Sequence, residues 1–186
     1  MFASQRLGLI RFEAASPAAL ELKVGLIKEC NRHPDADKLY VSQIITSEAE
    51  DATTLTVCSG LVNFISREDL LNKKVVLLTN LKPSKMRGIK SEAMILASED
   101  SEATKVEVVN PPISSELGDL LHFKPFIPEK KPSRLKSKIW EEVQSKLFTD
   151  SEGKVVFKSE DQEYRLSGSK SDDFAFVETL RNTIVR

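Results

Sequence analysis

The chain has 186 residues, with 27 Lys and Arg against 28 Asp and Glu, a formal net charge of -1 and 40% hydrophobic residues. This balance is typical of a folded globular protein and excludes wholesale disorder. It also argues against a polybasic binder, and no apolar run approaches the ~18 residues that a membrane span requires. At roughly 150 residues per domain, the length favours one domain with a substantial extension.

The two cysteines, Cys30 and Cys58, are too few for a disulfide framework, and neither has a second cysteine at zinc-binding spacing. Each is expected to pack as a small buried hydrophobe in a reducing compartment. Residues 1–19 are interpreted as an amino-terminal extension. Residues 1–12 carry two arginines and no acid, a weak mitochondrial presequence pattern. The sequence favours a cytoplasmic protein.

Residues 20–124 are predicted to form a small all-β domain. Six segments in it are rich in aliphatic or β-branched residues, and several alternate apolar and polar residues. In chain order these predicted strands are 20–27, 38–46, 53–58, 73–79, 92–97 and 118–123. A short helix is expected at 66–71, capped by Ser66. A helix between the third and fourth strands is the order of an OB-fold, a Greek-key barrel.

Residues 125–186 are predicted to form a small α+β extension that packs against the barrel. Prolines and lysines at 125–132 read as a linker. Ser133 is expected to cap a helix over 134–147, which carries an apolar stripe. Strands are predicted at 155–158, 164–166 and 174–180. The extension is too short and too apolar to fold alone, so its apolar side chains need the barrel surface.

No catalytic motif emerges from these residues. The glycines are too scattered for a phosphate-binding loop, and a nucleophile elbow is missing. His33 with Asp35 and Asp37 could suggest a metal site, but Pro34 and the two acids favour a tight turn between the first two strands. Neither a metal nor a cofactor is expected.

The sharpest motif is a basic segment at 80–91, NLKPSKMRGIKS, which joins two predicted strands. Pro83 and Gly88 are expected to hold it as a shaped loop. Four cations and two serines flank Met86, a combination that suits the phosphates and bases of a nucleic acid. A solvated charged surface is the alternative interpretation of such a cluster. Its position favours binding, because the loops beside the middle strands of an OB-fold bind oligonucleotides.

Together with HPDADKLY at 33–40, CSGLV at 58–62 and KIWE at 138–141, the basic segment resembles a known family. This is the tRNA-binding domain family of the endothelial-monocyte-activating-polypeptide type. The family includes the carboxy-terminal domains of some tyrosyl- and methionyl-tRNA synthetases and the yeast synthetase cofactor protein. The resemblance implies a monomeric OB-fold whose extension makes it a pseudo-dimer.

The resemblance also implies which residues contact RNA. They are polar, basic or flexible side chains near the first hairpin, the third strand and the basic segment: Lys28, Asn31, Arg32, His33, Lys38, Tyr40, Ser59, Asn63, Lys82, Lys85, Met86, Arg87, Lys90 and Ser91. For Tyr40 a core position is an equally open interpretation, and for Lys28 and Lys38 a solvated strand edge. The lysines at 130–138 are split by 132–135, which is unlike the family and weakens any RNA role for this segment.

The predicted function is a non-catalytic module that captures tRNA largely without sequence specificity and delivers it to an aminoacyl-tRNA synthetase. The expected partners are tRNA and a synthetase, with no membrane involved. The alternative is a protein-interaction scaffold of a synthetase complex, with incidental or general nucleic-acid binding.

Overall fold

The computed structural model describes residues 15–170 and 172–186. Most of the predicted amino-terminal extension, and with it the presequence pattern, therefore lies outside the described residues. The described chain opens with a 3-10 turn, η1 (Pro17–Ala19), whose N-cap Ser16 accepts a hydrogen bond from the Ala18 amide at 3.2 Å. It leads directly into the first strand.

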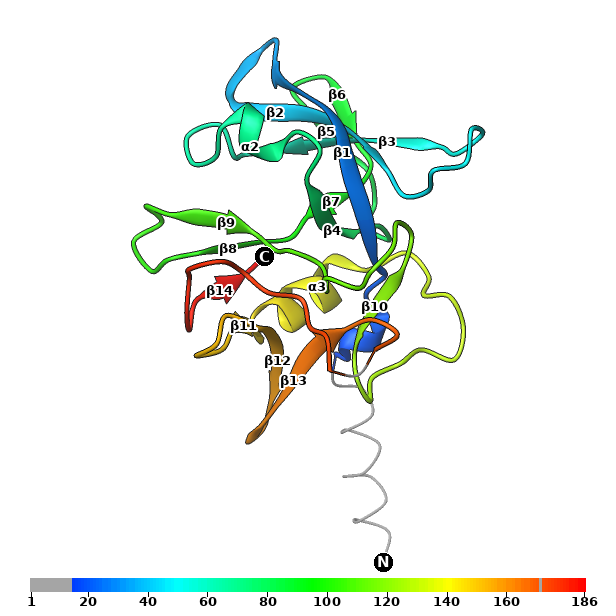
Figure 1. Ribbon diagram of the computed structural model, residues 1–186, viewed down its shortest axis with the longest axis vertical. Helices are drawn as coiled ribbons and strands as arrows, with labels where there is room; N and C mark the ends of the chain where they lie inside the picture. The colour runs from blue at the N-terminus through cyan, green and yellow to red at the C-terminus, as the bar shows by residue number, and fades with distance from the viewer. Residues whose placement is uncertain (1–14, 171) are drawn as a thin grey trace, which may run out of the picture.

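The first two thirds of the chain form the predicted barrel (Figure 1). Its elements are β1 (Leu22–His33), β2 (Ala36–Ile45), β3 (Thr54–Ser59), α2 (Arg67–Leu70), β4 (Lys74–Leu78), β5 (Ser84–Met86), β6 (Ile89–Ser91), β7 (Met94–Ile95), β8 (Ala97–Glu99), β9 (Val106–Val108) and β10 (Leu120–Phe123). The long β1 pairs antiparallel with β2 through its second half and with β4 through its first half. All six predicted strand segments contain strands, whereas β5, β6 and β9 were not predicted and β8 begins only at the last residue of a predicted segment.

The short helix α2 begins where the sequence predicts. The Ser66 side chain accepts a hydrogen bond from the Asp69 amide at 3.2 Å, which satisfies one of the free donors of the first turn. The helix ends at Leu70, a fully buried residue that anchors it to the barrel interior.

The strand β4 shows why residues 73–79 read as an unbroken apolar run. Val75 and Leu77 belong to the core inside the barrel, whereas Val76 and Leu78 belong to a second core outside it. Because successive strand side chains point to opposite faces, a strand covered on both faces must be apolar throughout.

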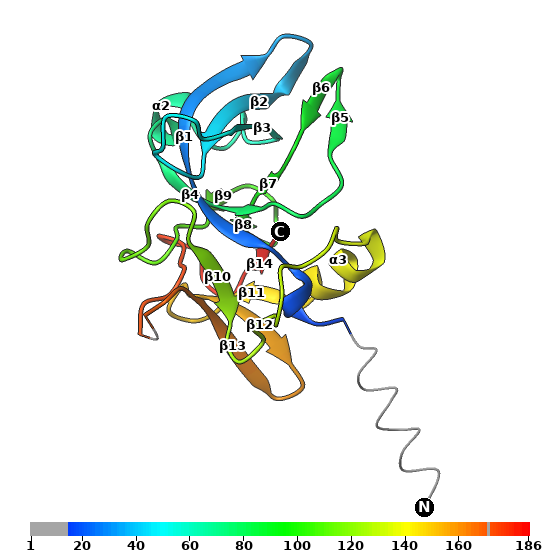
Figure 2. The same ribbon diagram turned by 90° about the vertical axis from the view of Figure 1, so that its right-hand side faces the viewer.

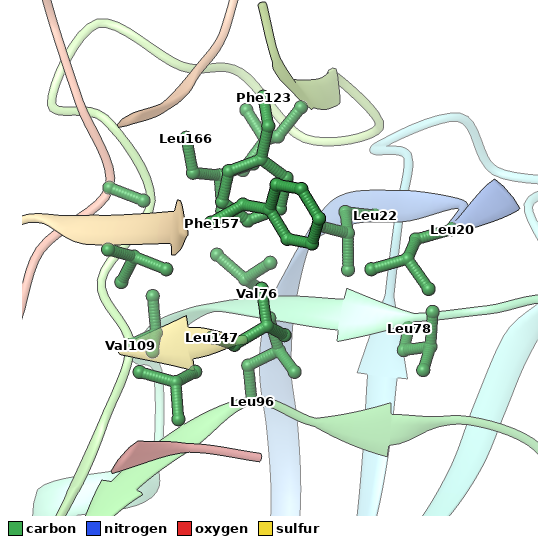
Figure 3. Close-up of a cluster of buried hydrophobic side chains, with 14 of the residues drawn as sticks. Leu20, Leu22, Val76, Leu78, Leu96, Val109, Phe123, Leu147, Phe157 and Leu166 are labelled. Carbon is green, nitrogen blue, oxygen red and sulfur yellow. The ribbon is translucent and has the colours of Figure 1, made fainter. Parts of the chain in front are cut away.

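The second core joins the barrel to the extension (Figure 3). Phe157, Leu147 and Leu166 of the extension lie against Leu22 and Val76 of the barrel in one cluster of buried side chains. The extension consists of α3 (Ser137–Gln144), β11 (Leu147–Thr149), β12 (Val155–Ser159), β13 (Gln162–Ser167) and β14 (Ile184–Val185). Its strands also continue the barrel sheet, since β13 pairs with β10 and β14 pairs with β8. The extension packs on the barrel through this shared core and these strand pairs.

The predicted boundaries of the extension's helix and last strand are wrong. Ser133 does not cap a helix: α3 starts at Ser137, and its N-cap residue Lys136 makes no side-chain capping bond. Residues before it are extended, because the Leu135 amide donates to the Asn80 carbonyl at 2.7 Å and Leu135 forms a parallel bridge with Leu81. Residues 174–180 form only isolated bridges instead of a strand, while β11 and β14 were not predicted.

Candidate nucleic-acid interface

The predicted basic loop is a β-hairpin. Strands β5 and β6 pair in register and are joined by Arg87 and Gly88, which have backbone φ angles of 52° and 89°. Two consecutive positive φ angles are the geometry of a type I′ turn, whose twist matches that of the flanking strands. Glycine adopts this conformation without strain, so Gly88 shapes the loop as predicted.

The cross-strand partners in this hairpin carry like charges. Lys85 lies directly opposite Lys90 in the register of β5 and β6. Like charges directly opposite each other destabilise a hairpin, and both side chains are exposed. Two adjacent ammonium groups are well suited to an anion such as a phosphate, which would relieve their repulsion.

A buried histidine ties this hairpin to the β1–β2 hairpin. The His33 side chain is only 4% exposed, and its Nδ1 accepts a hydrogen bond from the Asp35 amide at 2.9 Å. Its Nε2 lies 2.9 Å from the Met86 carbonyl oxygen, to which it donates in this tautomer. The two hairpins stand side by side at the end of the barrel remote from the extension (Figure 2). His33 was among the residues expected to contact RNA; its buried ring holds the two hairpins together.

The base of the β5–β6 hairpin is anchored by Asn80, which is also buried. Its Oδ1 accepts from the Glu21 amide at 3.0 Å, and its Nδ2 donates to the carbonyls of Ala19 and Ser133 at 2.8 and 2.9 Å. One amide side chain therefore joins the start of β1, the hairpin and the linker. These hydrogen bonds hold the backbone from which the β5–β6 hairpin and its cations extend.

Most of the predicted RNA-contacting residues are exposed. The exposed set is Lys28, Asn31, Arg32, Lys38, Asn63, Lys82, Lys85, Arg87 and Lys90, while Ser59 and Met86 are half-buried. Seven of these are cations, here called the hairpin cations: Lys28, Arg32, Lys38, Lys82, Lys85, Arg87 and Lys90. Within the described parts of the chain, none of the hairpin cations forms an ion pair with a carboxylate. Their charges are thus available to an external anion.

Two further predicted contacts are buried and serve the barrel. Tyr40 is 3% exposed and donates its hydroxyl to the Ile65 carbonyl at 2.8 Å, and burial raises the pKa of this phenol. Its ring has no free face for a base. Ser91 accepts from the Cys58 amide at 2.9 Å and donates to the Ala93 carbonyl at 3.2 Å. Its hydroxyl is used in closing the barrel.

Sequence reasoning missed Phe64, whose side chain is 41% exposed in the loop after β3. Phe64 lines two hollows. One, of about 400 Å³, also contains Lys82 and Met86, and the other contains Arg32 and Asn63. An aromatic residue directly after Asn63, a predicted contact, was the available signal.

The described residues contain no group of three or more His, Cys, Asp or Glu side chains arranged to hold a metal ion. No helix in the described ranges is long and apolar enough to cross a membrane. Burial raises the pKa of the Cys30 and Cys58 thiols, so both stay protonated and pack as the expected buried residues.

The family of this chain follows from its similarity to known proteins. Residues 22–120, more than half of the chain, match the family model described as "Putative tRNA binding domain". The chain belongs to this tRNA-binding domain family. The matched segment runs from the start of β1 to the start of β10, so it covers the barrel and both hairpins.

Several curated relatives are similar to this tRNA-binding domain and its extension. A probable methionine–tRNA ligase of Oryza sativa is 44% identical over 76% of the chain and 17% of its own length. The tRNA-aminoacylation cofactor arc1 of Schizosaccharomyces pombe is 39% identical over 89% of the chain and 37% of its own length. The mouse aminoacyl tRNA synthase complex-interacting multifunctional protein 1 is 44% identical over 75% of the chain and 44% of its own length. The chain thus spans less than half of the length of each of these relatives.

The whole architecture, extension included, also has a solved counterpart. The crystal structure of the C-terminal domain of Plasmodium vivax p43 superposes with a TM-score of 0.75 at 28% identity. The match covers 92% of this chain and 99% of that one. The barrel with its packed extension is therefore a recurring unit, as the resemblance implied.

Proposed function

We propose that this chain captures tRNA through the hairpin cations and delivers it to an aminoacyl-tRNA synthetase, acting by binding and not by catalysis. The observation that carries the proposal is the placement of seven cations, none in an ion pair with a described carboxylate, on and beside two hairpins joined by His33. In an OB-fold, the loops after the first and fourth barrel strands are where oligonucleotides bind. These are the two loops that the histidine connects.

The capture is expected to have little sequence selectivity. Lysine and arginine contacts to phosphate oxygens fix the position of a nucleic acid but carry no sequence information directly. Shape would supply the preference for tRNA, because structured RNA is recognised largely by its backbone geometry.

The names of the relatives support a synthetase as the partner. One relative is itself a methionine–tRNA ligase, another a tRNA-aminoacylation cofactor, and a third a synthase complex-interacting protein. A carrier of this kind raises the local concentration of tRNA beside the enzyme, which increases apparent affinity without new contacts at the active site. A cytoplasmic, monomeric chain, with the extension completing a pseudo-dimer, is part of this proposal.

Charge reversal at the hairpin tip tests the proposal. Fluorescence anisotropy with labelled bulk tRNA compares the wild type with the Lys85→Glu/Arg87→Glu variant at one salt concentration. A matched control, Lys105→Glu/Lys170→Glu, makes the same change in net charge at exposed positions outside the two hairpins. We expect the hairpin variant to weaken binding by more than about tenfold, because phosphate contacts dominate the affinity, and the control to bind nearly as well as the wild type.

Equal loss in both variants would mean that net charge, and not this surface, attracts tRNA. Binding retained in both would refute the proposed site. A pull-down of synthetases with the same variants tests separately whether the chain binds a synthetase. A scaffold would retain its synthetase in every variant and bind no tRNA.

A further inference from the structure

The hollow that contains Phe64, Lys82 and Met86 has the size of a small-molecule site. It measures about 400 Å³, within the range of about 300–1000 Å³ typical of small-molecule sites. Residues from β3, the β5–β6 hairpin, β7, β8 and β9 line it, together with Arg186. Its walls are mainly apolar, including Leu61, Met86 and Ile95.

Phe64 stands at a fixed place on the wall of this hollow. The turn that carries it is held by two hydrogen bonds, from the Phe64 and Ile65 amides to the Leu61 carbonyl, at 3.0 and 2.9 Å. The same side chain lines the neighbouring hollow that contains Arg32 and Asn63. Phe64 therefore lies between two concave surfaces, each of which includes a hairpin cation.

The lining of the hollow includes an exposed cation without an acidic partner. Of the two carboxylates that line it, Glu92 accepts from the Thr56 amide at 2.8 Å, and Glu99 pairs with Arg186 at 2.6 Å. Lys82 forms no ion pair with any described carboxylate. Lys82 is therefore available to a phosphate beside the hollow.

The size and lining of the hollow suit a nucleobase. It has about 400 Å³ of space and mainly apolar walls. A nucleobase is flat and has apolar faces, and these faces stack on aromatic side chains such as Phe64.

We propose that an unpaired nucleotide of the bound RNA inserts its base into this hollow and stacks it on Phe64, while Lys82 and the hairpin cations hold the adjoining phosphates. This inference rests on the proposed function and deepens it, because it specifies single-stranded RNA at one place on the surface. Unpaired bases commonly stack on aromatic side chains in protein–RNA complexes, and the stack tolerates any base because every base has a π face.

The test uses the full chain and two synthetic RNAs that share one fully paired duplex of two separate strands. One RNA ends blunt, and the other has an unpaired four-nucleotide 3′ extension containing the fluorescent base 2-aminopurine. The variants are Phe64→Ala, the conservative Phe64→Tyr, and Ile113→Ala, a control that removes an apolar side chain 83% exposed elsewhere. Circular dichroism checks that each variant is folded.

The wild type should bind the extended RNA at least about fivefold more tightly than the blunt one. Phe64→Ala should abolish this difference and the change in 2-aminopurine emission, with unchanged affinity for the blunt RNA. Phe64→Tyr and Ile113→Ala should behave as the wild type. Equal affinity of the wild type for both RNAs, or an emission change that survives Phe64→Ala, would overturn the inference.

The proposed function has its own readout. If Lys85→Glu/Arg87→Glu binds the blunt RNA as well as the wild type does, the cationic surface is wrong whatever Phe64 does. If that variant loses the blunt RNA while Phe64→Ala has no effect on either RNA, only the base site is wrong.

Discussion

The hairpin cations predict a steep dependence of tRNA affinity on salt. Each phosphate neutralised by a protein cation releases a condensed counterion, so the logarithm of the binding constant falls linearly with the logarithm of the salt concentration. If about four to six of the seven hairpin cations contact phosphates, the slope is about -3 to -5. Raising salt from about 50 to about 200 mM should therefore weaken binding roughly 60- to 1000-fold.

Single neutralisations test the same reasoning residue by residue. Lys85→Gln and Arg87→Gln should each reduce the magnitude of the slope by about one, because each removes one phosphate contact. Lys105→Gln, at an exposed position on the loop between β8 and β9, should leave the slope unchanged. Anisotropy titrations of labelled tRNA at five or more salt concentrations measure all four slopes.

Two results would refute this account. A wild-type slope near zero would mean that binding does not depend on phosphate contacts. A steep slope that Lys85→Gln and Arg87→Gln leave unchanged would place the contacts elsewhere on the molecule.

Two further predictions concern the core that joins barrel and extension. Phe157 is 2% exposed and packs against Phe123 and Phe126 at ring-centroid distances of 6.1 and 5.7 Å, so Phe157→Ala should lower the free energy of unfolding by about 3–5 kcal/mol; an unchanged urea midpoint would show that this ring is not a core contact. Burial, followed by the nearby Lys124, lowers the pKa of His122 from its usual 6.5. The unfolded chain then binds this proton more readily than the folded one, so stability falls as the pH drops below about 6.5. His122→Gln should remove that part of the loss in thermal melts across this range; an identical pH profile would contradict it.

Local patterns were sufficient for the main strands of the barrel and for the first helix. The apolar run of β4 predicted a strand covered on both faces, and its alternate residues do enter two separate cores. Ser66 predicted the start of α2, because an N-cap side chain accepts from backbone amides in the first turn of the same helix. Such signals act between near neighbours, which is why a sequence can reveal them.

The start of α3 shows where that reasoning ends. Ser133 precedes a good amphipathic stripe, yet its carbonyl accepts from Asn80, a residue 53 positions away. The backbone of residues near it is extended to meet the β5–β6 hairpin. A local capping preference of about 1 kcal/mol does not prevail over two tertiary hydrogen bonds with Asn80 and the burial of Leu135.

In the candidate interface, too, the sequence predicted some residues and the tertiary contacts decided the role of others. Residue type and spacing identified the exposed cations, since a charged side chain without a buried partner stays in water whatever the fold. Whether His33, Tyr40 and Ser91 face RNA or the interior depended on distant partners: Met86, Ile65 and Cys58. The sequence by itself determined the main barrel strands, the cationic segment and the family. Only the tertiary structure decided which polar side chains are consumed in holding the hairpins together and that Phe64 remains free at the surface, because those outcomes depend on which residues the folded chain brings into contact.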